Sequence, residues 1–158
     1  MNHGSMIGKE APGFTLRDSS ERHVSLGDFR GKKVVLYFYP KDNTPGCTLE
    51  AMDFSALKEE FGEAGAVVLG VSRDTCESHQ KFIDSKGLTI MLLSDPDAKV
   101  QKLYGVWKPK KFMGREFLGT VRSTFLIDGK GIVRHAWDPV KVRGHAKEVL
   151  GKVRSLSG

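Results

Sequence analysis

Short apolar runs alternate with longer amphipathic segments along the chain, and this pattern predicts a sheet covered by helices. Residues 32–40, "KKVVLYFYP", form a continuous run of β-branched and aromatic side chains, which is typical of a strand buried on both faces. The segments "AVVLGVS" (66–72) and "LTIMLLSD" (88–95) predict two further strands. The segment "RSTFLIDGKGIVRHAW" (122–137) predicts a hairpin that turns at 128–131.

Helical periodicity follows the first two of these strands. Residues 47–65 carry apolar side chains at helical spacing, which predicts one helix that stops at Gly62 or Gly65. The apolar positions of this predicted stripe are Leu49, Met52, Ala56, Leu57 and Phe61. Asp74 and Glu77 resemble a capping box, so we expect a second helix from there to about Lys86, ended by Gly87.

The remaining segments complete an α/β pattern. We expect short strands and turns over 6–30, a short helix within 97–106, a basic loop over 107–120 and a last amphipathic helix within 141–156. Strands that alternate with helices, followed by a hairpin, predict a central mixed β-sheet flanked by helices. No repeat or linker divides the chain, so we expect one domain over 6–158, while residues 1–5, "MNHGS", look like the remnant of an expression tag.

Composition narrows the class of protein. With 39% hydrophobic and 28% charged residues, the chain has the composition of a soluble globular protein. No apolar run approaches the roughly 20 residues of a membrane helix, and the first residues lack the apolar centre of a signal peptide. Two cysteines cannot form a disulfide framework, so we expect the reducing cytoplasm and no membrane association.

The net charge of +6 raises the question of nucleic-acid binding. The charge is spread along the chain, however, and the densest cluster, "KPKK" at 108–111, has one aromatic neighbour, Trp107, and no recognisable nucleic-acid motif. We therefore expect no nucleic-acid partner. A basic nucleic-acid-binding module remains an alternative, in which binding would depend on Lys108, Lys110 and Lys111.

Cys47 lies where the first strand gives way to the first helix. If the helix begins there, unpaired backbone N–H groups and the positive end of the helix dipole surround the sulfur and favour the thiolate, which is the nucleophilic form. Pro45 and Gly46 suit a tight turn into the helix, and Thr44 offers a hydroxyl that can donate to a bound oxygen. A buried cysteine acting as a small hydrophobe is the plain alternative, but the neighbours of Cys47 are polar residues and turn formers.

Other cysteine chemistries lack their signatures in this sequence. Cys47 has no C-x-x-C partner, and the position six residues later, where a phosphatase loop has arginine, is Asp53. The five histidines are all distant in sequence from Cys47, and no further metal ligands lie near it. The sequence also contains no P-loop and no dinucleotide-binding fingerprint.

The stretch "PKDNTPGCTLEA" resembles the P-x-x-x-T-x-x-C active-site motif of peroxiredoxins, and "PGCTLEAMDF" is similar to the bacterioferritin comigratory protein (PrxQ) subfamily. The segments "APGFTLRD", "VVLGVSRDTCESHQKF", "LLSDPDAKVQKLYGV", "RSTFLIDGKGI" and "GHAKEVL" resemble that subfamily in the same order, so the likeness covers nearly all of 6–155. The resemblance implies a thioredoxin-like fold and a thioredoxin-dependent peroxidase that reduces hydrogen peroxide and organic hydroperoxides. Antioxidant defence and cell redox homeostasis would be its role, and the resemblance implies a reaction that needs neither a metal nor an organic cofactor.

The resemblance also implies roles for four residues. Cys47 matches the peroxidatic cysteine that becomes a sulfenic acid, Thr44 the threonine that hydrogen-bonds the peroxide, and Pro40 the proline that shields the site. Arg122 in "VRSTF" matches the distant arginine that completes the site. A guanidinium near the sulfur would stabilise the thiolate and the charge that develops on the departing oxygen.

Recycling of the sulfenic acid is left open by the sequence. The two positions at which subfamily members carry a resolving cysteine are Met52 and, by our alignment, Ile83, so the only other thiol is Cys76. Cys76 could resolve Cys47 through an internal disulfide, or an external thiol such as thioredoxin could complete a one-cysteine cycle. We expect Cys76 to lie in the first turn of its helix and to have thiolate character. A further alternative is a redox sensor that oxidises quickly without sustained turnover. We expect a monomer.

Overall fold

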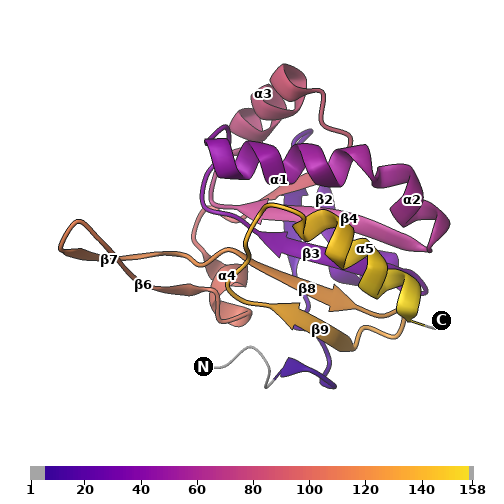
Figure 1. Cartoon of the computed structure of the whole chain (residues 1–158). Coiled ribbons are helices and arrows are strands. Elements are labelled where there is room, and N and C mark those ends of the chain that lie inside the picture. The colour runs from indigo at the N-terminus through magenta and orange to yellow at the C-terminus, as the bar shows by residue number, and fades with distance from the viewer. Residues whose placement is uncertain (1–5, 157–158) are drawn as a thin grey trace.

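The computed structural model describes residues 6–156 and shows a seven-stranded sheet with helices on both faces, from which a separate two-stranded hairpin projects (Figure 1). The suspected tag remnant, residues 1–5, lies outside the described residues. The strands are β1 Thr15–Asp18, β2 His23–Ser25, β3 Lys33–Phe38, β4 Ala66–Ser72, β5 Met91–Ser94, β6 Trp107–Phe112, β7 Arg115–Thr120, β8 Ser123–Ile127 and β9 Val133–Trp137. The helices are the short 3-10 helix η2 Leu26–Phe29, α1 Pro45–Ala56, α2 Lys58–Glu63, α3 Cys76–Lys86, α4 Lys99–Leu103 and α5 His145–Ser155.

The main sheet has the strand order β2-β1-β5-β4-β3-β8-β9. Strands β3, β4 and β5 run parallel, joined by crossovers through α1–α2 and α3, whereas β1, β8 and β9 pair antiparallel with their neighbours. The prediction of a central mixed sheet flanked by helices is therefore confirmed. The parallel strands all end at the same edge, which is where a doubly covered sheet presents its loops for chemistry.

Strand β3 is central because side chains from both of its faces enter a core. Val35 and Tyr37 join the apolar cluster under α1, α2, α3 and α5, while Val34, Leu36 and Phe38 join the cluster on the opposite face, with α4. All five are at most 2% exposed. The continuous apolar run that predicted a strand buried on both faces is thus explained.

The single helix expected over 47–65 is instead two helices, α1 and α2, that meet at Leu57. The backbone of Leu57 leaves helical geometry (φ −102°, ψ 9°). The carbonyl of Ser55 accepts a hydrogen bond from the Thr89 hydroxyl at 3.1 Å, so it is satisfied outside the helix. A helix whose last carbonyls find partners elsewhere can end without a glycine.

The buried face of α1 does not coincide with the apolar positions whose spacing predicted the helix. Leu49 and Met52, two of those positions, are each 46% exposed. The buried stripe instead contains Cys47, Glu50, Ala51 and Phe54. The Phe54 ring stacks on Tyr37 of β3 with ring centroids 4.8 Å apart, and this contact fixes the rotation of α1 about its axis.

Two further local predictions are wrong. Helix α3 is capped by Thr75, whose hydroxyl accepts from the Ser78 N–H at 3.1 Å, and not by Asp74. Residues 107–120, expected as a basic loop, form the antiparallel hairpin β6–β7. Its strands, the lysine-rich β6 and the lysine-free β7, carry no clean alternation of apolar and polar residues, because the hairpin has no core face to bury.

The remaining elements follow their predictions closely. Gly87 adopts a left-handed conformation (φ 63°) and ends α3, the hairpin β8–β9 turns within 128–132, and α5 buries one apolar stripe against the sheet. Among residues 6–156, no helix has both the length and the apolar character needed to cross a membrane.

Gly70 of β4 provides a test of how tightly the central sheet is packed. A Cβ atom at this position would lie 2.7 Å from Cζ of Tyr37 and 2.8 Å from Cδ2 of Leu92. We expect Gly70→Ala to lower the free energy of unfolding by about 2 kcal/mol, because overpacking forces neighbouring rings out of their rotamers. Urea denaturation followed by circular dichroism measures the change.

The matched control is Gly151→Ala in α5, where a Cβ meets nothing within 4 Å. This replacement should raise the free energy of unfolding by roughly 0.5–1 kcal/mol, since alanine loses less backbone entropy in a helix. A Gly70→Ala protein as stable as the parent would contradict the close packing over β4.

Candidate active site

Cys47 lies in the first turn of α1, at the edge of the sheet where β3 ends. Thr44 is the N-cap residue in extended geometry. Pro45 occupies the first helical position, where the missing N–H of proline costs no helical hydrogen bond. The first intrahelical bond runs from the Thr48 N–H to the Thr44 carbonyl at 2.8 Å, so the N–H groups before it lack helical partners. The Cys47 side chain is thus close to the positive end of the helix, in a residue only 1% exposed.

Arg122, just before β8, reaches the sulfur from the opposite side. Its Nη2 donates to Cys47 Sγ at 3.3 Å and its Nη1 to Glu50 Oε1 at 2.6 Å. Gly46 makes this approach possible, because a Cβ there would lie 3.3 Å from Nη2. Burial lowers the pKa of Arg122, but the negative charges of Glu50 and Cys47 outweigh burial and leave the pKa above its usual value. The guanidinium is therefore a permanent cation beside the sulfur.

Glu50 is a site residue that the sequence analysis missed. Its side chain is 1% exposed, and burial raises its pKa from 4.5 to about 7, although Arg122 acts in the opposite direction. Its second oxygen, Oε2, has no hydrogen-bond partner among the described residues. A carboxylate three residues after a helix-start cysteine lies on the same helical face, and that spacing was the available signal.

Thr44 and Pro40 lie in the loop that precedes α1. The Thr44 hydroxyl donates to the Lys41 carbonyl at 2.9 Å. Because a carbonyl can only accept, the single hydroxyl hydrogen of Thr44 is used there, and toward a bound ligand its oxygen is an acceptor and not the expected donor. Pro40 is exposed at the end of β3 and lines an open groove together with the base of the β6–β7 hairpin.

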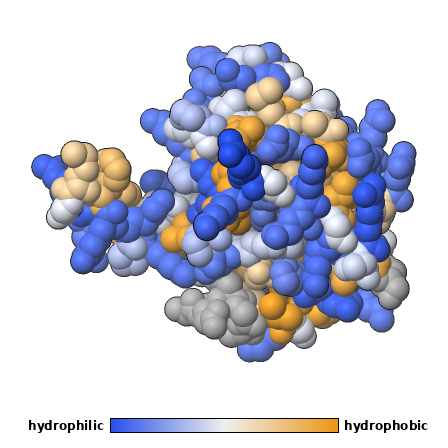
Figure 2. Space-filling view, in the orientation of Figure 1, coloured by the Kyte–Doolittle hydropathy of each residue, from blue (hydrophilic) through white to orange (hydrophobic). Residues whose placement is uncertain are grey.

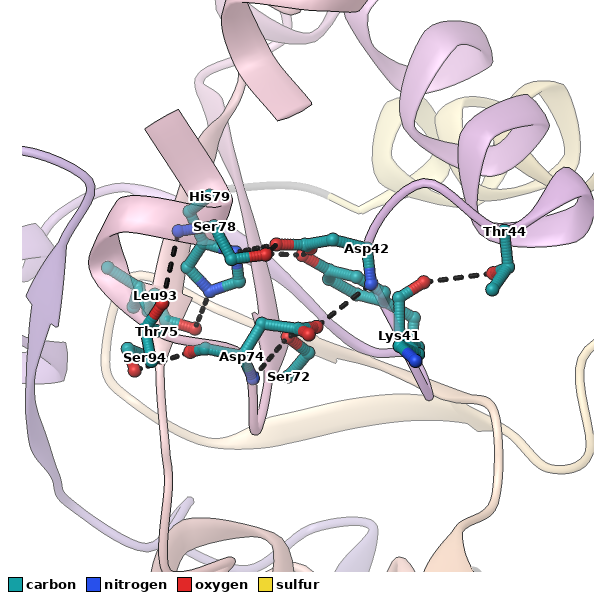
Figure 3. A network of polar contacts seen from close by, with 11 residues as sticks. Lys41, Asp42, Thr44, Ser72, Asp74, Thr75, Ser78, His79, Leu93 and Ser94 are labelled. Carbon is teal, nitrogen blue, oxygen red and sulfur yellow. Dashed lines mark hydrogen bonds and ion pairs between the residues drawn. The ribbon is translucent and has the colours of Figure 1, made fainter. Parts of the chain in front are cut away.

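A buried polar network fixes this loop to the neighbouring elements (Figure 3). The Asp42 carboxylate accepts from the Tyr39 hydroxyl at 2.5 Å and from the Ser78 hydroxyl at 2.8 Å, and it pairs with Nδ1 of His79 at 2.7 Å. His79, itself fully buried, also bonds the Leu93 carbonyl of β5 through Nε2 at 3.0 Å. The loop is therefore tied to α3 and to the centre of the sheet.

Asp74 ties the same loop to β4. Its Oδ2 accepts from the Asp42 backbone N–H at 2.8 Å and from the Ser72 hydroxyl at 2.6 Å. Candidate ligand atoms of Asp42, Asp74 and His79 lie within 4.8 Å of one another. These atoms are already occupied by the hydrogen bonds of the network, so the arrangement is that of an internal brace and not of an open metal site.

Cys76 is the first residue of α3 and is half-buried. Burial raises the pKa of its thiol, and the nearby carboxylate of Glu21 raises it further, so the expected thiolate character is wrong. Its charged neighbours, Arg17, Asp18 and Glu21, belong to the β1–β2 hairpin. Strand β1 is three positions from β3 in the sheet, roughly 14 Å at the usual strand spacing. Neither Cys47 nor Cys76 is in a disulfide.

Neither buried histidine bonds Cys47. His79 is bound to Asp42, and His145 bonds the Thr124 hydroxyl at 2.8 Å through Nε2. Burial lowers the pKa of His145 to about 4, so this ring is neutral at physiological pH. A cysteine hydrolase needs a histidine within hydrogen-bond reach of the thiol, so the geometry disfavours that chemistry.

Comparison with known proteins identifies the family to which this site belongs. The model of the AhpC/TSA family matches residues 7–136. The chain belongs to this family. A Helicobacter pylori relative assigned to peroxiredoxin Bcp is 52% identical over 144 residues, which are 91% of this chain and 95% of the relative. Peroxiredoxin Bcp of Bacillus subtilis is 46% identical over 151 residues, 96% of each protein.

Solved structures agree with the sequence relatives. Xanthomonas campestris peroxiredoxin Q superposes with a TM-score of 0.86 at 44% identity and covers 90% of each chain. The expected thioredoxin-like fold and the resemblance to the Bcp/PrxQ peroxiredoxins are thus confirmed. As a member of the AhpC/TSA family, the chain is a thiol-dependent peroxidase.

The raised pKa of Glu50 gives a pH-dependent stability with a defined sign. Because the folded-state pKa, about 7, lies above 4.5, the native state binds more protons than the unfolded state between these values. The free energy of unfolding should therefore fall as pH rises from about 4.5 to about 7, by up to roughly 1.4 kcal/mol per pH unit from this group. Urea denaturation at pH 5.5 and 7.5 measures the loss.

The control for this prediction is Glu50→Gln, which keeps the shape of the side chain and cannot ionise. The free energy of unfolding of the parent, measured relative to that of the glutamine variant, should be higher at pH 5.5 than at pH 7.5. An identical pH profile in both proteins would show that Glu50 does not titrate in this window.

Proposed function

We propose that Cys47 is the residue that reduces the hydroperoxide, with Arg122 and Thr44 binding it and Pro40 bordering the approach to the site. The observation that carries this proposal is the 3.3 Å hydrogen bond from Arg122 Nη2 to Cys47 Sγ, made in the first turn of a helix. Both the guanidinium and the helix N-terminus favour a negative sulfur, and a thiolate is the form that attacks peroxides.

The chemical step needs no metal or organic cofactor. The Cys47 thiolate attacks the terminal oxygen of a hydroperoxide, the S–O bond forms as the O–O bond breaks, and an alkoxide or hydroxide departs and takes a proton from water. Cys47 is left as a sulfenic acid. Arg122 stabilises the charge that moves from sulfur to the departing oxygen, and the Thr44 oxygen accepts from the hydrogen of the terminal oxygen.

The substrate class follows from the solved relatives. An alkyl peroxide reduction activity is described for the Xanthomonas campestris bacterioferritin comigratory protein, which is 44% identical to this chain. We infer that this chain accepts both hydrogen peroxide and organic hydroperoxides, and that it serves antioxidant defence and redox homeostasis.

We infer further that the cycle uses one cysteine of this chain. Cys76 neighbours the β1–β2 hairpin, and its thiol has a raised pKa, so it is poorly suited to attack the oxidised Cys47. Thioredoxin or another external thiol then reduces the sulfenic acid through a mixed disulfide. A consumer of thiols fits a reducing compartment such as the cytoplasm, and a single domain over 6–158 acting as a monomer suffices for this cycle.

The assignment of Cys47 and Arg122 is tested by peroxide consumption with dithiothreitol as the reductant. Cys47→Ser should abolish activity, because a serine hydroxyl is neither ionised nor reducing at neutral pH. Arg122→Ala should lower the rate constant for peroxide reduction by about 100-fold, the usual effect of removing one preorganised donor. Retention of most of the activity in Cys47→Ser would refute the assignment.

The matched control for this test is Cys76→Ser, which removes the other thiol and should leave the rate with dithiothreitol within two-fold of the parent. A parent protein that oxidises once and then fails to consume further peroxide with any thiol would favour a redox sensor over a peroxidase.

The one-cysteine cycle is tested by mass spectrometry of the reduced protein after one equivalent of hydrogen peroxide, with a sulfenic-acid trap present. We expect the adduct on the peptide that contains Cys47 and none on the peptide that contains Cys76. A loss of two hydrogens with a crosslinked Cys47–Cys76 peptide would instead make Cys76 the resolving residue.

A further inference from the structure

The β6–β7 hairpin stands away from the body of the protein and exposes apolar surface at its end (Figure 2). Its strands pair only with each other, in a sheet separate from the seven-stranded one. Four of the eight exposed large apolar residues of the described chain belong to it: Phe112 (67% exposed), Met113 (87%), Phe117 (47%) and Leu118 (58%). An apolar cluster on a projecting arm indicates a surface that a partner covers.

One of the two central residues of the turn at the end of the hairpin, Met113, disfavours the geometry that the turn adopts. Met113 (φ +51°) and Gly114 (φ +76°) are the two central residues of the connection, both in left-handed geometry. Asn-Gly is strongly favoured in such a turn, and a left-handed backbone costs a methionine roughly 1–2 kcal/mol. The methionine therefore adds exposed apolar surface at a cost to local stability, which points to a role in contact.

The charge of the hairpin limits what that partner can be. Lys111 and Arg115 flank the apolar residues near the turn, with one carboxylate beside them, Glu116. Lys108 and Lys110 add positive charge nearer the body, where Lys108 pairs with Asp138 at 3.7 Å and Lys110 donates to the Thr120 carbonyl at 2.9 Å. A partner that buries this surface without leaving unpaired cations needs an apolar patch with an acidic rim. A second copy of this chain, with the same positive excess, would bring like charges together.

The hairpin is rooted at the active site. Strand β7 ends at Thr120, two residues before Arg122, whose guanidinium bonds Cys47 Sγ. A groove of about 510 Å³ separates the base of the hairpin from the loop that leads to Cys47. Its walls include Pro40 and Lys41 on the loop side and Trp107, Phe117 and Leu118 on the hairpin side.

The dimensions suit one small protein that contacts both the end of the arm and the mouth of the groove. A six-residue strand spans about 20 Å, and a folded domain of about 100 residues has a radius of gyration near 13 Å. Such a domain can contact the end of the hairpin while one of its thiols lies at the mouth of the groove.

We propose that the β6–β7 hairpin is the docking arm for the protein thiol that reduces oxidised Cys47, a small domain with a dithiol at the centre of an apolar, acid-rimmed surface. This inference rests on the proposed external reductant. In the reaction, a thiolate of the partner attacks the sulfenic sulfur of Cys47, the oxygen leaves as water after protonation, and a mixed disulfide forms. The second thiol of the partner then attacks the partner's sulfur in the mixed disulfide. This step releases the Cys47 thiolate and leaves the partner with an internal disulfide.

The experiment is steady-state peroxide reduction by the full chain with a bacterial thioredoxin, its reductase and NADPH, set beside the same assay with dithiothreitol. The test variant is Phe112→Ser combined with Met113→Asn, in which asparagine suits the turn and guards against misfolding. We expect KM for thioredoxin to rise at least ten-fold with kcat within two-fold, and the dithiothreitol rate to stay within two-fold of the parent.

Two comparisons make the result specific. Leu103→Ser removes an exposed apolar residue (53% exposed) outside the hairpin and should leave KM for thioredoxin unchanged. Raising the salt from 0.05 to 0.5 M should raise KM for thioredoxin in the parent, because screening weakens the pairing of lysines with acidic groups, and should not affect the dithiothreitol rate.

Several outcomes would overturn the docking arm. An unchanged KM for thioredoxin in the hairpin variant would overturn it, and so would a parent that turns over with dithiothreitol but not with thioredoxin. Both outcomes would leave the peroxidase activity of Cys47 in place. A variant that loses the dithiothreitol rate as well would place the hairpin in catalysis instead. Loss of binding to single-stranded DNA or to anionic lipid vesicles, with KM intact, would identify a nucleic-acid or membrane contact.

Discussion

The Arg122 guanidinium, held between the Cys47 sulfur and the Glu50 carboxylate, is the interaction around which the site is arranged. One planar cation donates to both groups, at 3.3 Å and 2.6 Å. The arrangement requires α1 to turn Cys47 and Glu50 inward together, and it requires β8 to be paired beside β3 so that Arg122 enters from the far side. Gly46 leaves the space for the guanidinium. The positions of Cys47, Glu50 and Arg122 relative to one another therefore depend on how α1 and β8 pack against β3.

The loop before α1 is held by a different and more deeply buried set of bonds. Both ring nitrogens of His79 face polar oxygens, one of the Asp42 carboxylate at 2.7 Å and the Leu93 carbonyl at 3.0 Å, so both sides of the ring are held. A buried pair of this kind adds little net stability, but removing one partner leaves the other unsatisfied, so it specifies one conformation of the loop. The start of α1 is thereby placed relative to β4, β5 and α3.

Much of the fold follows from local patterns in the sequence, and the exceptions have physical causes. The strands buried on both faces carry continuous apolar runs, so β3 and β4 could be predicted from the local sequence alone. The rotation of α1 was not, because its exposed face is as apolar as its buried one and the choice is made by Phe54 stacking on Tyr37. Hairpin β6–β7 was missed because it has no buried face, and its lysines and glycines have the composition of a loop.

The candidate site shows the same division. Cys47, Thr44 and Pro40 are close in sequence and can be inferred from one motif, whereas Arg122 is 75 residues from Cys47 and is connected to it only through the fold. Glu50 has only a weak signal, its spacing of three residues from Cys47, because a glutamate on a helix is ordinarily solvent-exposed. Its importance follows from the charges. A thiolate and a carboxylate share one guanidinium, and oxidation to the sulfenic acid removes the negative charge on sulfur. Glu50 then still neutralises Arg122, so the cation keeps its position while the charge on Cys47 changes through the cycle.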